Sequence, residues 1–363
     1  MKHFNKKKQL ILKLFYPFFL MLGVVLGKKN WIKKEKYASI LVLDLHLIGD
    51  MVMLIPLLKE LKIKYPDSNL SLLAGSWAPI ILKELEIDNF YILDAPWVKS
   101  NTILSWLNLF RTIVKLRTFK WELAIDVRGD LRNSLILNLI GGERRVGYNF
   151  MHNGFLLNDI VENNDYLHLS DFNKGIGIHL NLFENNYRYV PHIDSSIALD
   201  KPISGKKIIG IHFGASLPLR IPKIELVFQW LDQIIDIDNN ECLYLVFELP
   251  ERIEFSDRIY RFLKEKVDAN YWKGGLAEFR EALKECDHLY CFDSGPAHIG
   301  AAFGINVSVI FGPSSPINVG PIGKNVKYLN ISDKPYCWPC AGIYCINSNH
   351  QECYNFADIK LKV

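Results

Sequence analysis

Residues 291–304 read CFDSGPAHIGAAFG and have the layout of a phosphate-binding turn between a strand and a helix. The apolar residues 288–292 predict a buried strand, which ends at Asp293-Ser294-Gly295-Pro296. Small residues then begin a helix that stops at Gly304. The backbone N–H groups at such a helix start bind anions, and the helix dipole favours the same charge. A well-capped core helix has the same pattern, so the rest of the chain must distinguish the two.

The alternation of apolar strand, turn and helix extends in both directions from this turn. It predicts helices over residues 51–64, 224–235 and 277–285, and an α/β fold of parallel sheets. The polar residues 163–200 lack a long helical period, and residues 201–206 form the predicted linker between two doubly wound domains. A ligand cleft is expected between these domains, at the carboxyl ends of the strands. The predicted strands are residues 40–45, 70–74, 90–93, 123–127, 208–213, 243–247, 288–292 and 307–311.

Charge and cysteine content exclude some classes of protein. The 363 residues carry a net charge of +4, and the basic residues do not gather on one predicted element. This pattern argues against a nucleic-acid partner. Seven cysteines is an odd number, and three of them lie in apolar context, which favours a reducing, cytoplasmic location.

The N-terminal residues 1–37 form a basic and apolar segment. Residues 10–27 are almost wholly apolar and have lysines on both sides. Eighteen helical residues span roughly 27 Å, which is borderline for crossing a bilayer. We expect a shallow anchor on the anionic inner face of the membrane, with a true span or a helix packed on the protein as alternatives.

Five short motifs occur in one order along the chain, and together they resemble the heptosyltransferase family, family 9 of the glycosyltransferases. They are residues 47–50 (LIGD), 126–129 (DVRG), 214–216 (GAS), 293–298 (DSGPAH) and 311–314 (FGPS). The resemblance covers roughly residues 38–355. It implies the GT-B fold, in which two Rossmann-like domains face each other across a cleft. The expected domains are an acceptor domain over residues 38–200 and a donor domain over residues 207–363.

The resemblance also implies a role for particular residues. Asp50 corresponds to the base that takes the proton of the acceptor hydroxyl, although a cap on the following helix would also explain it. Donor binding is expected from Ser216, Arg220, Glu251, Asp293, Ser294, Gly295 and His298. His46, Arg128 and Arg132 are the candidates on the acceptor side, and Arg144 and Arg145 are further cations there. A solvated surface role is the alternative for all four arginines on the acceptor side.

Two positions differ from the family pattern. Family members often carry an arginine where this chain has Asp44, and a serine where it has His46. The acceptor and the donor sugar therefore stay open at this point.

The tail contains four cysteines at short spacings, and they suit a tetrahedral thiolate site for zinc or iron. A structural metal, paired thiols and free thiols are all compatible with this pattern. We expect such a site to lie far from the chemistry, since inverting GT-B transfer needs no cofactor. The cysteines are Cys337, Cys340, Cys345 and Cys353, within residues 337–353.

The sequence thus predicts an inverting glycosyltransferase of the heptosyltransferase type. The expected donor is a nucleotide diphosphate sugar, with ADP-heptose favoured. The expected acceptor is a lipopolysaccharide core or another lipid-linked surface glycan at the inner membrane. A sugar-nucleotide epimerase on the same fold and a catalytically silent nucleotide-sugar-binding scaffold are the alternatives.

Overall fold

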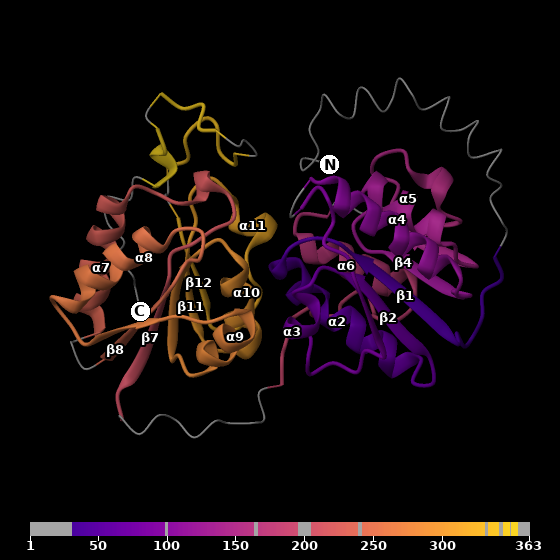
Figure 1. Ribbon diagram of the computed structural model, residues 1–363, viewed down its shortest axis with the longest axis horizontal. Helices are drawn as coiled ribbons and strands as arrows, with labels where there is room; N and C mark the ends of the chain where they lie inside the picture. Colours follow the sequence, from indigo (N-terminus) through magenta and orange to yellow (C-terminus); the bar gives the residue numbers. More distant parts are fainter. Residues whose placement is uncertain are drawn as a thin grey trace. The chain divides into compact units, whose positions relative to one another are not determined.

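The computed structural model describes residues 31–98, 101–162, 166–194, 205–238, 242–330, 333–340, 344–348 and 350–354 (Figure 1). The chain divides into two compact units, Met1–Tyr189 and Val190–Val363. Each is a parallel sheet flanked by helices, which confirms the predicted α/β class. Residues 10–27 and most of the predicted linker, residues 201–204, lie outside the described residues.

The N-terminal unit contains a six-stranded parallel sheet in the order β3-β2-β1-β4-β5-β6. The central strand β1 pairs with β2 on one side and β4 on the other, and its residues from Ile40 onward are buried. This burial explains the continuous apolar run in its sequence. The strands are β1 (Ser39–Asp44), β2 (Asn69–Ala74), β3 (Asn89–Ile92), β4 (Leu123–Asp126), β5 (Arg144–Gly147) and β6 (Asp159–Ile160).

The helices of this unit connect the strands and cover the sheet. Helix α2 starts at Ile48, three residues earlier than predicted, and Asp50 therefore lies in its first turn. Helix α4 attaches through Leu109 and Leu116, which belong to the same apolar core as Leu41 and Ala124. The elements are α2 (Ile48–Lys64), α3 (Ala78–Ile81), α4 (Ile103–Arg117), α5 (Leu131–Ile140), α6 (Leu169–His179) and the short 3-10 helix η1 (Gly154–Leu156).

The C-terminal unit repeats this architecture with the strand order β12-β11-β10-β7-β8-β9. Its core contains Trp230, Tyr244 and Phe292 between the sheet and helix α7. The strands are β7 (Lys207–His212), β8 (Cys242–Phe247), β9 (Ala269–Trp272), β10 (His288–Phe292), β11 (Asn306–Ile310) and β12 (Val326–Leu329). The helices are α7 (Ile224–Asp238), α8 (Ile253–Lys264), α9 (Leu276–Lys284), α10 (Gly295–Phe303) and α11 (Pro316–Val319), with the 3-10 helices η2 (Pro218–Arg220) and η3 (Glu352–Tyr354).

Residues 163–200 show no clear helical period, and no helix was predicted there. Helix α6 lies within this stretch, so the interpretation is wrong for residues 169–179. Among the helices of the described residues, none is both long and apolar enough to span a bilayer.

Candidate functional site

Each sheet has one topological switch point, where the connections change direction. In the N-terminal unit it lies between β1 and β4, and in the C-terminal unit between β7 and β10. The loops that follow these strands diverge and leave room for a ligand at the carboxyl edge of the sheet. The predicted catalytic and donor residues fall mainly in these four loops.

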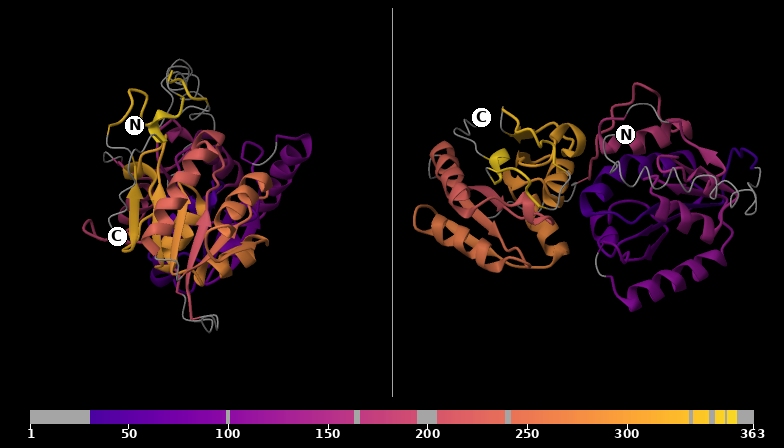
Figure 2. Two further views of the ribbon diagram at one scale, coloured as in Figure 1. Left: turned by 90° about the vertical axis from the view of Figure 1, so that its left-hand side faces the viewer. Right: turned by 90° about the horizontal axis from the view of Figure 1, so that it is seen from above.

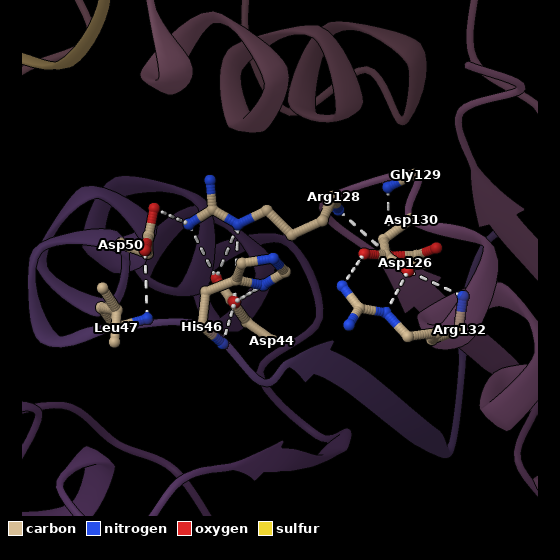
Figure 3. Close-up of polar contacts among 9 residues, drawn as sticks. All are labelled: Asp44, His46, Leu47, Asp50, Asp126, Arg128, Gly129, Asp130 and Arg132. Atoms are coloured by element: carbon tan, nitrogen blue, oxygen red, sulfur yellow. Dashed lines mark hydrogen bonds and ion pairs between the residues drawn. The ribbon is translucent and has the colours of Figure 1, made fainter. Parts of the chain in front are cut away.

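The N-terminal switch point holds an arginine between two aspartates (Figure 3). The Arg128 side chain comes from the loop after β4, and its Nη2 lies 3.1 Å from Oδ2 of Asp44 and 2.7 Å from Oδ1 of Asp50. Asp44 is fully buried at the end of β1, and only 6% of the Arg128 side chain is exposed. A buried carboxylate needs such a partner, because an unpaired charge in the interior is very unfavourable.

Asp50 uses both carboxylate oxygens. Oδ1 forms the ion pair with Arg128. Oδ2 accepts a 3.0 Å hydrogen bond from the backbone N–H of Leu47, the residue before α2. Asp50 therefore caps α2, as the alternative explanation of this residue proposed. Each carboxylate oxygen has two lone pairs, so Asp50 retains the capacity to accept a further hydrogen bond. The Asp50 side chain is 15% exposed, which leaves it accessible.

His46 lies close enough to Asp44, Arg128 and Asp50 for their charges to act on it. Its Nδ1 is 3.1 Å from Oδ1 of Asp44. Burial lowers the pKa of His46, but the hydrogen bond and charge of Asp44 outweigh burial and raise it overall. Burial also acts against ionisation of Asp44, and Arg128 with His46 still holds the pKa of that carboxyl well below its usual range. The site is thus a network of alternating charges.

A tight turn after β4 places Arg128. The Asp126 carboxylate accepts hydrogen bonds from the backbone N–H groups of Arg128 and Gly129, and from the Ser134 hydroxyl. Gly129 has a φ of +66°, and a Cβ there would lie 2.7 Å from that of Tyr148, so the turn requires glycine. Burial raises the pKa of Asp126 to about 6, against the effect of these hydrogen bonds.

The cations predicted on the acceptor side have different environments. Arg132 is half exposed, pairs with Asp130 at 2.5 Å and lies over the Trp97 ring. Arg128, Arg144 and Arg145 are buried, so a solvated surface role is wrong for these three. Arg144 forms a 2.7 Å ion pair with Asp159, and Arg145 donates to backbone carbonyls. Both therefore hold the structure together.

The C-terminal switch point also holds an arginine and an aspartate. Arg220, at the end of η2, lies 3.1 Å from Oδ2 of Asp293, which follows β10. Asp293 is buried and also accepts a hydrogen bond from the Ser314 hydroxyl. The Arg220 side chain is 26% exposed, so part of its guanidinium faces outward.

Helix α10 begins directly beside this pair, with Ser294 at its N-cap. The Ser294 side chain donates to the carbonyl of Phe292 and does not cap the helix, so its first N–H groups are not used by that hydroxyl. His298 is buried one turn into α10. Ser216 and Glu251 are exposed in the loops after β7 and β8. The structure thus brings Arg220, Asp293 and Ser294 together.

The cysteine-containing tail contacts the loop that carries Arg220. Tyr354 donates a 2.6 Å hydrogen bond to the carbonyl of Arg220, and Gln351 donates to the carbonyls of Leu219 and Ile221. Trp338 donates to the carbonyl of Gly312, just before Ser314. The sequence carried no sign of these contacts, because they join residues more than 100 positions apart in the first two cases.

The described residues contain no group of three or more His, Cys, Asp or Glu side chains arranged to hold a metal ion. Within the described residues, Cys337, Cys340, Cys345 and Cys353 form no disulfide bond. Burial, together with the charges of the other three cysteines, raises the pKa of Cys353 to about 12. In the part of the tail that the structure describes, these four thiols are not arranged as the predicted tetrahedral site.

The comparisons with known proteins agree with this geometry. Residues 258–350 match glycosyltransferase family 9 (heptosyltransferase). The chain is 22% identical over 318 residues to lipooligosaccharide heptosyltransferase 2 of Campylobacter jejuni, covering 84% of this chain and 90% of that protein. The chain is a heptosyltransferase-like glycosyltransferase, similar to family 9.

Solved structures of such enzymes share the fold of this glycosyltransferase. A family 9 glycosyltransferase from Veillonella parvula superposes with a TM-score of 0.66 at 19% identity, covering 82% of this chain and 87% of that one. The E. coli heptosyltransferase WaaC with ADP gives a TM-score of 0.67 at 14% identity, covering 80% and 92%. These likenesses and the two six-stranded parallel sheets confirm the two-domain GT-B fold.

Proposed function

We propose that this glycosyltransferase moves a heptose from ADP-heptose to the core of a lipooligosaccharide, with inversion at the anomeric carbon. Relatives of this chain bind ADP, and one is named for a lipooligosaccharide. The proposed acceptor is anchored in lipid, so the proposed place of action is the cytoplasmic face of the inner membrane. The proposed reaction uses no cofactor.

The observation that carries the proposal is the Arg220–Asp293 pair at the start of α10. Asp293 itself repels a diphosphate, and its contacts indicate that it orients Arg220 and Ser314. The guanidinium of Arg220 can grip two phosphate oxygens, and the N–H groups of Ser294 and Gly295 can bind a third. These groups stabilise the negative charge that develops on the departing ADP. Ser216, Glu251 and His298 remain proposed donor contacts.

At the other switch point, Asp50 is the proposed base. It accepts the proton of the acceptor hydroxyl while that oxygen attacks the anomeric carbon, and the bond to the ADP oxygen breaks. Arg128 holds Asp50 in place from one side and Leu47 from the other. Such positioning lowers the entropy cost of reaching the transition state. His46 and Arg132 remain proposed acceptor contacts.

Calorimetric binding of ADP, UDP, GDP and CMP tests the donor assignment. We expect selective ADP binding that weakens by at least about tenfold in Arg220→Ala, because one charge-assisted bidentate contact is lost. Arg261→Ala is the matched control, since that arginine is 74% exposed on α8. Preference for another nucleotide would contradict ADP-heptose as the donor.

Asp50→Asn tests the base. We expect it to retain ADP affinity and to lose transfer by about 100-fold or more, the usual contribution of a positioned base. Asp67→Asn, at a side chain that is 88% exposed, should change neither quantity. Equal loss of folding stability and transfer would indicate that Asp50 is only a cap. Release of free nucleotide without an acceptor would point to an epimerase.

A further inference from the structure

Helix α4 has an exposed apolar stripe on the side that faces away from its own domain. The stripe consists of Ile103, Leu107, Phe110 and Val114, with exposed fractions of 81, 44, 64 and 49%. Their spacing of i, i+4, i+7 and i+11 places them along one side of the helix. The right-hand view of Figure 2 shows α4, the purple helix that follows the short grey trace at residues 99–100, at the edge of the N-terminal unit.

The opposite side of α4 is what attaches it to the domain. Ser105, Leu109 and Leu116 are buried there, and the two leucines belong to the core below the helix. A helix that is anchored by one apolar side normally presents polar residues on the other. An exposed apolar row of this length therefore needs a partner.

Charge identifies the partner. Residues 101–120 contain Arg111, Lys115, Arg117 and Lys120, and they contain no aspartate or glutamate. Arg111 and Lys115 follow the stripe along its length, and both are exposed. Apolar side chains flanked by lysine and arginine, without acidic residues, are typical of helices that lie in the surface of an anionic bilayer.

We propose that α4 docks this protein on anionic lipid, with Ile103, Leu107, Phe110 and Val114 inserted between the lipid headgroups. Arg111 and Lys115 then lie at the level of the lipid phosphates, where each attracts the negative surface. Trp106, which is half exposed beside the stripe, suits the same interfacial depth. The inference rests on the surface of α4 alone and does not depend on the proposed sugar transfer.

Lipid titration with vesicles tests the proposal, with full-length protein in every case. The vesicles are phosphatidylcholine alone or phosphatidylcholine with phosphatidylglycerol, and bound protein is measured by flotation. Ile103→Glu combined with Phe110→Glu should lower the partition coefficient by at least about tenfold, since two apolar side chains no longer insert. Ile63→Glu is the matched control, because Ile63 is 70% exposed on α2, away from the stripe, and should leave binding unchanged.

A second pair of substitutions separates charge from insertion. Arg111→Gln with Lys115→Gln should weaken binding to the vesicles with phosphatidylglycerol by roughly fivefold for each charge removed, and should have little effect on phosphatidylcholine alone. Residues 1–30 are present in all variants, so their own contribution to binding cancels.

Three results would overturn the proposal. If the glutamate variant binds vesicles like the wild type, α4 does not contact lipid. If sedimentation shows a dimer that this variant dissociates, with vesicle binding unchanged, a second copy covers the stripe. If the variant lowers the unfolding temperature without changing vesicle binding, another part of this chain covers it. None of these readouts involves nucleotide or transfer, so they fail or succeed separately from the proposed reaction.

Discussion

The two switch points contain the same pair of residue types in exchanged positions. In the N-terminal unit the first strand of the sheet supplies aspartate and the loop after β4 supplies arginine. In the C-terminal unit the arginine, Arg220, lies after the first strand, β7, and the aspartate, Asp293, directly follows β10. The environments differ as well: Arg128 is buried between two carboxylates, whereas Arg220 is partly exposed beside one.

This difference is the one expected if Arg128 is structural and Arg220 binds the proposed donor. The charge of Arg128 is more than balanced by Asp44 and Asp50, so the N-terminal switch point presents a carboxylate to its ligand. The charge of Arg220 is balanced by one carboxylate, that of Asp293. The N-terminal end of α10 adds the positive end of a helix dipole. The C-terminal switch point therefore presents a more positive surface than the N-terminal one. A base on one unit and an anion site on the other are what sugar transfer from a nucleotide diphosphate requires.

The largest expected effect comes from removing each arginine in turn. Arg128→Ala leaves Asp44 buried without its partner and should lower the free energy of unfolding by about 3–5 kcal/mol. Arg220→Ala should lower it by less, about 1–3 kcal/mol, because Arg220 is partly exposed and the buried Asp293 keeps its hydrogen bond from Ser314. Urea unfolding of both variants measures this contrast. Similar losses in the two variants would show that the arginines do not differ in role.

The aspartates that end β4 and follow β10 provide a second contrast. Asp293 pairs with an arginine, whereas Asp126 accepts hydrogen bonds from neutral donors, and burial raises the pKa of Asp126 to about 6. The folded state therefore keeps a proton that the unfolded state, with a pKa near 4, has already lost. Stability is favoured below pH 4 and falls by about 3 kcal/mol as the pH rises to about 6.

Unfolding free energies of the wild type and Asp126→Asn between pH 4 and pH 7 measure this effect. As the pH rises to about 6, the free energy of unfolding of Asp126→Asn should increase relative to that of the wild type by about 3 kcal/mol, and the difference should then stay constant. Asp130→Asn is the control and should stay nearly flat between pH 4 and pH 7, because burial opposes ionisation of Asp130 but Arg132 outweighs it and lowers its pKa, so its own pH dependence lies below this range. A flat difference for Asp126→Asn would mean that this carboxylate is ionised throughout.

The sequence was sufficient for most of the fold, and the reason is burial. All eight strands predicted from apolar runs are present within one residue of their predicted ends. Most of them are buried on both sides and have little freedom in composition, whereas the edge strand β3 is only partly buried. The strands that were missed lie toward the edges of the sheets or carry polar residues, such as β5 with its buried Arg144 and Arg145. Helix α6 was missed because two glycines and polar residues obscure its apolar side.

The candidate site was predictable residue by residue, but its pairing was not. Asp50, Arg220 and Asp293 follow from the motifs. The contact between Asp44 and Arg128 depends on the register of β1 against β4, where Leu43 pairs with Asp126. One sign was present in the sequence: Asp44 stands where relatives often carry arginine, and such a charge change calls for a cation elsewhere. Arg128 supplies it.

The smallest expected effect concerns the tail, which supports only the C-terminal switch point in the contacts described above. Tyr354→Phe removes the hydrogen bond to the carbonyl of Arg220 and should lower the free energy of unfolding by about 1 kcal/mol. Because the η2 turn then holds Arg220 less firmly, ADP affinity should also fall by a few-fold. Tyr336→Phe is the matched control, since its hydroxyl donates to Ile346 within the tail and its side chain is exposed. If both variants bind ADP like the wild type, the tail stabilises the fold without shaping the anion site, and the two switch points differ less than their arginines suggest.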